Sequence, residues 1–136
     1  MSDNEMWYTN LKQILFTHFK VKVLATLDGA YENINFTNDD RNTEETKLPT
    51  VLFEELTPVE RGNTLDNTSV NGVSETIQIT VYSNERYDTK TIMNACVGAM
   101  KSLRFSVPGF PIYETNHDIK YGVARFRRVI AESDTL

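Results

Sequence analysis

The chain has 136 residues, a length typical of a single domain with a modest hydrophobic core. Hydrophobic residues make up 40% of the sequence and charged residues 24%, which excludes an intrinsically disordered chain. The formal net charge of −5 argues against the broad basic surface with which proteins bind nucleic acid. The single cysteine, Cys96, excludes an internal disulfide and a four-cysteine zinc site, and its helical surroundings indicate a buried thiol.

The first ten residues, "MSDNEMWYTN", are acidic and polar, and they lack the basic and apolar regions of a signal peptide. No apolar run approaches the ~20 residues that a membrane-spanning helix needs. We therefore expect a soluble protein that resides inside the cell.

A helix is predicted over the segment from Asp3 to Phe19, because apolar residues and one histidine recur there at helical spacing. These residues are Trp7, Leu11, Ile14, Leu15 and His18. The following "FKVKV" alternates apolar and basic residues and predicts a strand at 19–23, and Asp28 with Gly29 indicates a turn.

Two short strands with a polar loop between them are expected next. Ile34 and Phe36 alternate with polar residues, residues 38–47 are polar throughout, and "TVLFEEL" follows Pro49. Val51 and Phe53 fall on one face of that second strand, and we expect this face to be buried.

The segment at about 57–74 is rich in turn formers, which predicts a long polar loop. The turn formers are Pro58, Gly62, Asp66-Asn67 and Asn71-Gly72. "NGVSETIQITVYS" then predicts a strand with Ile77, Ile79 and Val81 on one face. A loop of this length is uncommon in a compact domain unless it has a function.

A second helix is predicted over about 89–103 with Asp88 as its N-cap, and a final strand over "DIKYGVARFRRVIA". In that strand Arg128 shares a face with the apolar Ala124, Phe126 and Ile130. The order of elements predicts one α+β domain over residues 1–136: a mainly antiparallel β-sheet with two helices packed on one face.

Catalytic motifs are absent from the sequence: it has no phosphate-binding glycine loop, nucleophile elbow or zinc-binding helix. We therefore expect no enzymatic activity, no catalytic or metal-binding residues and no cofactor. Glu54 and Glu55 are adjacent on a strand and point to opposite faces, so they do not chelate one ion together, and they are interpreted, with Glu60 and Asp66, as solvated or inter-subunit charges. A small metal-dependent nuclease-like enzyme built on Glu114, His117 and Asp118 is a distant alternative.

One basic stretch stands out in the acidic chain, "ARFRRVI". Alternation places Arg125 and Arg127 on one strand face and Arg128 on the other. A solvated strand face, or contacts with carboxylates of a neighbouring subunit, is the favoured interpretation, and nucleic-acid binding is the alternative.

Four segments carry a resemblance to a known family: "LPTVLFEELTPVE", "TLDNT", "TIQITVYSNE" and "IKYGVARFRRVIAES". Together they resemble the tail terminator (tail completion, or tail-to-head joining) proteins of long-tailed bacteriophages, such as the tail terminator of phage lambda. The resemblance implies a small α/β subunit in a hexameric ring that caps the tail tube and stops its polymerisation. It further implies contacts with the tail-tube protein and a head-completion (neck) protein, a lumen through which DNA passes without specific binding, no contact with a membrane, and location in the virion tail after assembly in the host cytoplasm.

Within this interpretation we expect Arg61 and Asp66 in the polar loop, and Arg125 and Arg127 on the last strand, to contact neighbouring subunits or partners. Charge reversal at these positions is expected to weaken assembly without unfolding the subunit. A head-completion or other neck protein of the head-tail connector is the alternative within the same class.

Overall fold

The structure, a computed structural model, describes residues 10–31, 33–38, 49–63, 70–107 and 109–131, with the backbone alone at 57–63 and 70–71. Within this part of the chain, five strands form one sheet and two helices accompany it. In chain order the elements are α1 (Leu11–Leu27), β1 (Asn35–Thr37), β2 (Thr50–Asn63), β3 (Val70–Ser83), α2 (Arg86–Ser102), β4 (Ile112–Asn116) and β5 (Ile119–Ala131). The predicted α+β class is confirmed.

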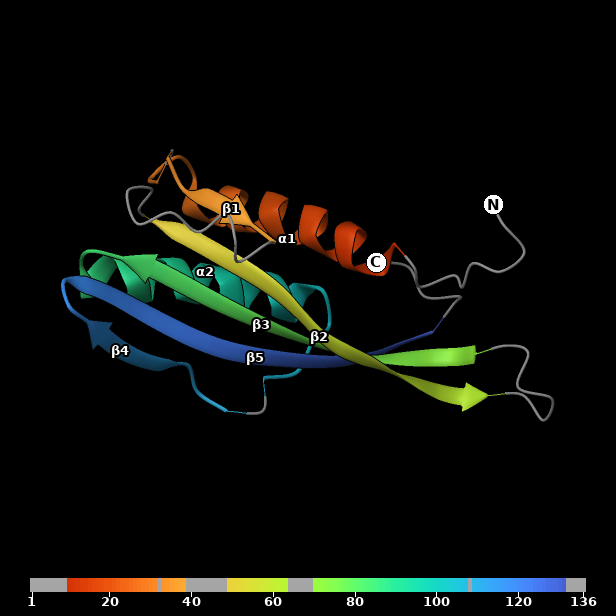
Figure 1. Cartoon of the computed structure of the whole chain (residues 1–136). Helices are drawn as coiled ribbons and strands as arrows, with labels where there is room; N and C mark the ends of the chain where they lie inside the picture. The colour runs from red at the N-terminus through yellow and green to blue at the C-terminus, as the bar shows by residue number, and fades with distance from the viewer. Residues whose placement is uncertain (1–9, 32, 39–48, 64–69, 108, 132–136) are drawn as a thin grey trace.

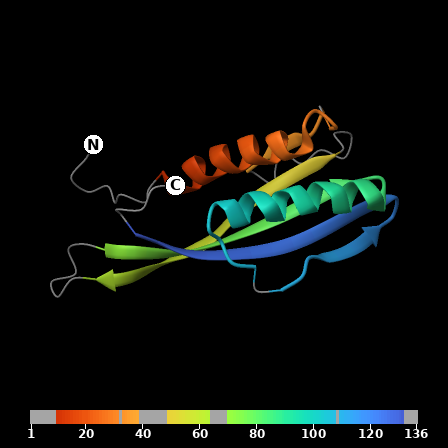
Figure 2. The same ribbon diagram turned by 180° about the vertical axis from the view of Figure 1, so that it is seen from behind.

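The strands lie in the order β1-β2-β3-β5-β4. β1 is parallel to β2, and every other neighbouring pair is antiparallel. Both helices pack on the same face of this sheet, as predicted, and none of the described residues forms a helix on the opposite face (Figures 1 and 2). The far ends of β2 and β3 extend beyond both helices in both views.

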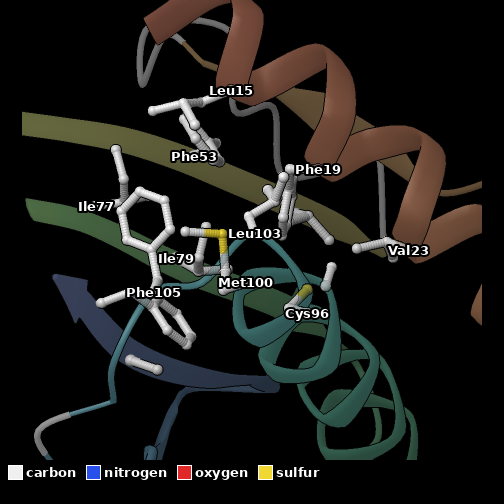
Figure 3. Close-up of a cluster of buried hydrophobic side chains, with 14 of the residues drawn as sticks. Leu15, Phe19, Val23, Phe53, Ile77, Ile79, Cys96, Met100, Leu103 and Phe105 are labelled. Carbon is white, nitrogen blue, oxygen red and sulfur yellow. The ribbon is translucent and has the colours of Figure 1, made fainter. Parts of the chain in front are cut away.

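The core lies between the helices and the sheet face that they cover (Figure 3). α1 contributes residues at four-residue spacing and β3 contributes residues at two-residue spacing, as each periodicity requires. Phe53 of β2 packs against Phe19 of α1 with 5.1 Å between the ring centroids. The residues that these three elements contribute to the core cluster are Leu11, Leu15, Phe19, Val23, Val51, Phe53, Ile77, Ile79 and Val81.

The predicted strand at 19–23 is wrong, because α1 continues through it to Leu27. Phe19 and Val23 are both fully buried at helical spacing, whereas Val21 is 62% exposed. The same residues, 19–23, therefore fit the spacing of a buried helix face as well as the alternation of a strand. α1 ends where Asp28 adopts a left-handed conformation and donates its N–H to the carbonyl of Leu24. The predicted start at Asp3 lies outside the described residues.

The predicted polar loop at 57–74 is largely wrong. β2 continues to Asn63 and β3 begins at Val70, so only residues 64–69 lie between them. The pairing of β2 with β3 continues through the turn formers on both strands. It has one irregularity, between Leu56 and Val59, where Pro58 interrupts the pairing.

Two smaller differences concern α2 and β4. α2 begins at Arg86 with Glu85 as its N-cap residue, so Asp88 lies in the first turn and is not the cap. β4, a five-residue edge strand, was not predicted because the prolines before it obscure its pattern. The predicted loop at 38–47 lies almost entirely outside the described residues.

Candidate assembly surface

The sheet face opposite the helices, here called the outer face, is crossed by rows of side chains from neighbouring strands. Strand register defines each row, because directly paired residues point to the same side of a sheet. One row runs from Glu54 on β2 through Gln78 on β3 to Arg125 on β5. It is polar throughout, and we refer to it as the polar row.

Hydrogen bonds connect the three members of the polar row. The Arg125 Nε donates to Gln78 Oε1 at 2.9 Å, and the Gln78 Nε2 donates to Glu54 Oε1 at a longer 3.4 Å. Gln78 thus joins a carboxylate on one side to a guanidinium on the other. The row consequently carries negative charge on its β2 side and positive charge on its β5 side, and Arg125 itself is exposed.

Arg127 lies two residues further along β5 and is also exposed on the outer face. Its backbone N–H and carbonyl are bonded to Ser106. Arg128 points the other way, is 8% exposed, and donates from Nη1 to the carbonyl of Leu103 at 2.8 Å. The predicted division of the three arginines between two faces is confirmed, and the structure brings Arg125 and Arg127 together.

A second row on the outer face is aromatic. The rings of Tyr82 and Tyr121 lie with centroids 6.1 Å apart, and the Tyr121 hydroxyl donates to Glu114 Oε2 at 2.7 Å. That hydrogen bond to a carboxylate raises the pKa of Tyr121 above its ordinary value. The row therefore holds Glu114 in place on the edge strand β4.

The two sheet edges are unevenly covered. β1 pairs with only three residues of β2, and on the side of β2 away from β3 no strand in the described part of the chain pairs beyond Leu52. On the other side β4 covers β5 as far as Val123, and Ser106 bridges to Arg127. The sheet thus ends in two different edges, and unpaired edge groups are places where another chain can add a strand.

The distal part of the β2–β3 ladder, residues 59–63 and 70–74, is here called the arm (Figure 1). Arg61 lies in the arm, and its backbone pairs with Gly72. Its side chain, and the whole of Asp66, lie outside the described residues. The structure therefore places the Arg61 backbone at the far end of the sheet.

The residues of the enzyme alternative lie at the β4–β5 turn and are exposed. His117 adopts a left-handed backbone conformation with φ 56°, as a tight turn requires. Within the described ranges, no group of three histidine, cysteine, aspartate or glutamate residues is arranged to hold a metal ion. His18, predicted on the apolar stripe of α1, is exposed.

One polar residue on the core face was missed by the sequence interpretation. Glu75 of β3 is 1% exposed and lies between the fully buried Val73 and Ile77. It lay in the segment predicted as a strand, and its two-residue spacing from Ile77 is the signal that assigns it to the core face. Gln78 was likewise predicted on the outer face, but its role in joining Glu54 to Arg125 needed the register of three strands.

Comparison with known proteins found no family model that matches the chain and no curated protein with significant similarity to it. No helix in the described residues is long and apolar enough to cross a membrane.

Proposed function

We propose that the chain is a structural subunit of a closed ring, a tail terminator that caps the tail tube of a long-tailed phage or prophage. The observation that carries this proposal is the polar row, which presents a carboxylate on the β2 side of the sheet and an arginine on the β5 side. Opposite charges on opposite sides of one subunit favour head-to-tail contact between identical copies. Such a heterologous interface closes into a ring when its rotation matches the number of subunits.

The uneven sheet edges support the same proposal. The β2 edge beyond Leu52 and the β5 edge differ in length, in charge and in what covers them. An interface between two copies of the same edge would oppose like charges, which is unfavourable, whereas contact between the two different edges opposes unlike charges. Head-to-tail contact is therefore the arrangement that the charges favour.

The arm supports a role in stacking. It projects beyond the helices, where it has room to contact a neighbouring subunit or the last ring of the tail tube (Figure 2). In this proposal the ring binds the tube on one side and the head-completion protein on the other, and DNA passes through its lumen without specific binding. The subunit acts by binding and not by catalysis, in the host cytoplasm during assembly and in the virion tail afterwards.

The first test is the mass of the purified chain by light scattering after gel filtration, over a range of concentrations and with the tail-tube protein added. A six-subunit species, formed alone or on the tube, is the expected result. Binding to a head-completion protein with no effect on tube length would overturn the terminator assignment in favour of another neck protein. A monomer that neither binds tube ends nor limits their growth would overturn the ring itself.

A further inference from the structure

The arm meets the body of the sheet at a break in the β2–β3 ladder. Leu56 pairs with Thr76 and Val59 pairs with Ser74, so Thr57 and Pro58 on β2 face the single residue Glu75 on β3. Such a bulge bends its strand, and Pro58 has no N–H to donate to the ladder. The bulge therefore weakens the pairing of β2 with β3 at the root of the arm, whereas β3 stays paired with β5 through Glu75 as far as Gly72.

Glu75 places a carboxyl group on the core face at this break. The side chain is buried, and neither of its oxygens accepts a hydrogen bond from a donor in the described part of the chain. A buried carboxylate without a donor is costly, whereas the neutral acid costs far less. The position therefore disfavours the charged form of Glu75.

Charged groups lie next to Glu75 on both neighbouring strands, β2 and β5. From β2, Glu55 lies diagonally across the ladder and its carboxyl interacts with that of Glu75. From β5, Arg128 is directly opposite Glu75 in register, with Nη1 bonded to the carbonyl of Leu103. Among helix-end residues, Lys12 donates to the carbonyl of Asn38, and Lys101 and Arg104 are exposed.

Burial, together with the Glu55 carboxyl, raises the pKa of Glu75 to about 8. Both causes act in the same direction, because each penalises the ionised form. The proton on Glu75 is thus lost in a pH range where an ordinary glutamate is already fully ionised.

We propose that Glu75 and Glu55 form a proton-linked hinge at the root of the arm. With Glu75 neutral, the two carboxyl groups lie together without repulsion and the arm stays paired to the sheet. When Glu75 ionises, the buried charge and its repulsion by Glu55 are relieved by opening the pairs next to the bulge. This inference concerns the single subunit, so it stands or fails independently of the proposed ring.

The test compares the full-length chain with its Glu75→Gln, Glu55→Gln and Glu85→Gln variants. Glu85 is an exposed glutamate at the start of α2 and serves as the matched control. Two quantities are followed between about pH 6 and 9.5: the ¹³C shift of the Glu75 carboxyl, and hydrogen exchange in peptides from the arm, corrected for intrinsic exchange rates.

We expect arm protection to fall as Glu75 ionises, by up to about tenfold per pH unit above its midpoint. Glu75→Gln should abolish this dependence, Glu55→Gln should lower the midpoint, and Glu85→Gln should change neither. Arm protection that is constant through the Glu75 midpoint would overturn the hinge. So would a Glu75 midpoint at an ordinary glutamate value, or a pH dependence that survives in Glu75→Gln.

Discussion

Glu75 occupies a site on β3 where the two-residue alternation fills every neighbouring inward position with an apolar side chain. Val73, Ile77, Ile79 and Val81 are all fully buried on the same face. Across the ladder, Arg128 extends the polar character to β5. The core therefore has an apolar centre beneath the helices and a polar end at the root of the arm.

The raised pKa of Glu75 makes the free energy of unfolding depend on pH. The folded chain holds this proton up to about pH 8, whereas the unfolded chain releases it near the ordinary value of 4.5. Stability from Glu75 is thus complete below about pH 4.5 and is lost as pH rises towards 8, by up to about 1.4 kcal/mol per unit. Urea denaturation at several pH values should show this slope as a difference between the native chain and Glu75→Gln. Equal slopes in the two proteins would contradict the assignment.

Cys96 lies on α2 in the centre of the core and is fully buried. Burial raises the pKa of its thiol, so it is neither ionised nor accessible at neutral pH. We expect no reaction with a thiol reagent in the native state and complete reaction in denaturant. Cys96→Ser should destabilise the fold by about 1–3 kcal/mol, since its hydroxyl is buried without a partner, and by more than Cys96→Ala. Rapid labelling of the native chain would show that this part of the core opens.

Strand alternation was a good guide to which side of the sheet a residue faces. It correctly separated Arg125 and Arg127 from Arg128, and Glu54 from Glu55, because β5 and the part of β2 before its bulge keep a period of two. Glu75 lay in the segment predicted as a strand, but the burial of its carboxyl group was not predicted. Alternation therefore predicted the face on which a side chain lies, but not how deeply a polar side chain is buried there.

Elements were predictable where one periodicity dominated and uncertain where two fitted equally well. The apolar residues of "FKVKV" fit both the two-residue spacing of a strand and the four-residue spacing of a helix. In the structure the segment is helical, because Phe19 and Val23 are the residues that α1 buries. The ends of β2 and β3 were missed for a different reason. Turn formers such as Asn71-Gly72 were taken as breaks, but pairing with β5 at Ala131 keeps Gly72 within the sheet.

At the scale of an element, Gly122 shows why β4 and β5 approach closely. A Cβ atom there would lie 2.8 Å from Cε1 and 2.9 Å from Cδ1 of Tyr113, which is too close for either ring atom. Gly122→Ala should therefore displace the Tyr113 ring and destabilise the fold by about 1–3 kcal/mol. Urea denaturation measures the loss, and the NMR signals of Tyr113 report the movement of its ring.

Gly98 provides the matched control for that substitution. It lies exposed on α2, and a Cβ atom there would meet nothing within 4 Å. Gly98→Ala should stabilise the chain by about 0.5–1 kcal/mol, because alanine loses less backbone entropy in a helix. A loss of stability in Gly122→Ala together with a gain in Gly98→Ala would show that the steric requirement is specific to Gly122. Equal changes in the free energy of unfolding would contradict it.

For the whole molecule, the sequence predicted the layered architecture because the long amphipathic α2 and the alternating β3 each require one covered face. It did not predict the parallel pairing of β1 with β2, because β1 has only three residues. The alignment of Glu54, Gln78 and Arg125 in the polar row could not be predicted either, because it depends on the register of three strands that are far apart in the chain. The charges themselves, at Arg125 and Arg127, were identified.

A charge exchange across the polar row tests the proposed ring at this scale. Arg125→Glu would oppose Glu54 of a neighbouring copy, and we expect it to weaken each interface by about fivefold to tenfold. Glu54→Arg combined with Arg125→Glu restores opposite charges and should recover the ring. The same reversal at Arg86, exposed at the start of α2 in the helical layer, is the control and should leave assembly unchanged.

Light scattering over a concentration series measures assembly in each variant, and circular dichroism confirms that the subunit stays folded. Recovery in the double variant is the informative result, because a merely structural role for Arg125 predicts additive damage and no rescue. The rescue must also weaken at high salt, since exposed charge pairs are screened. Additive losses, or a ring that is indifferent to both charges, would mean that the two sides of the sheet do not meet between subunits.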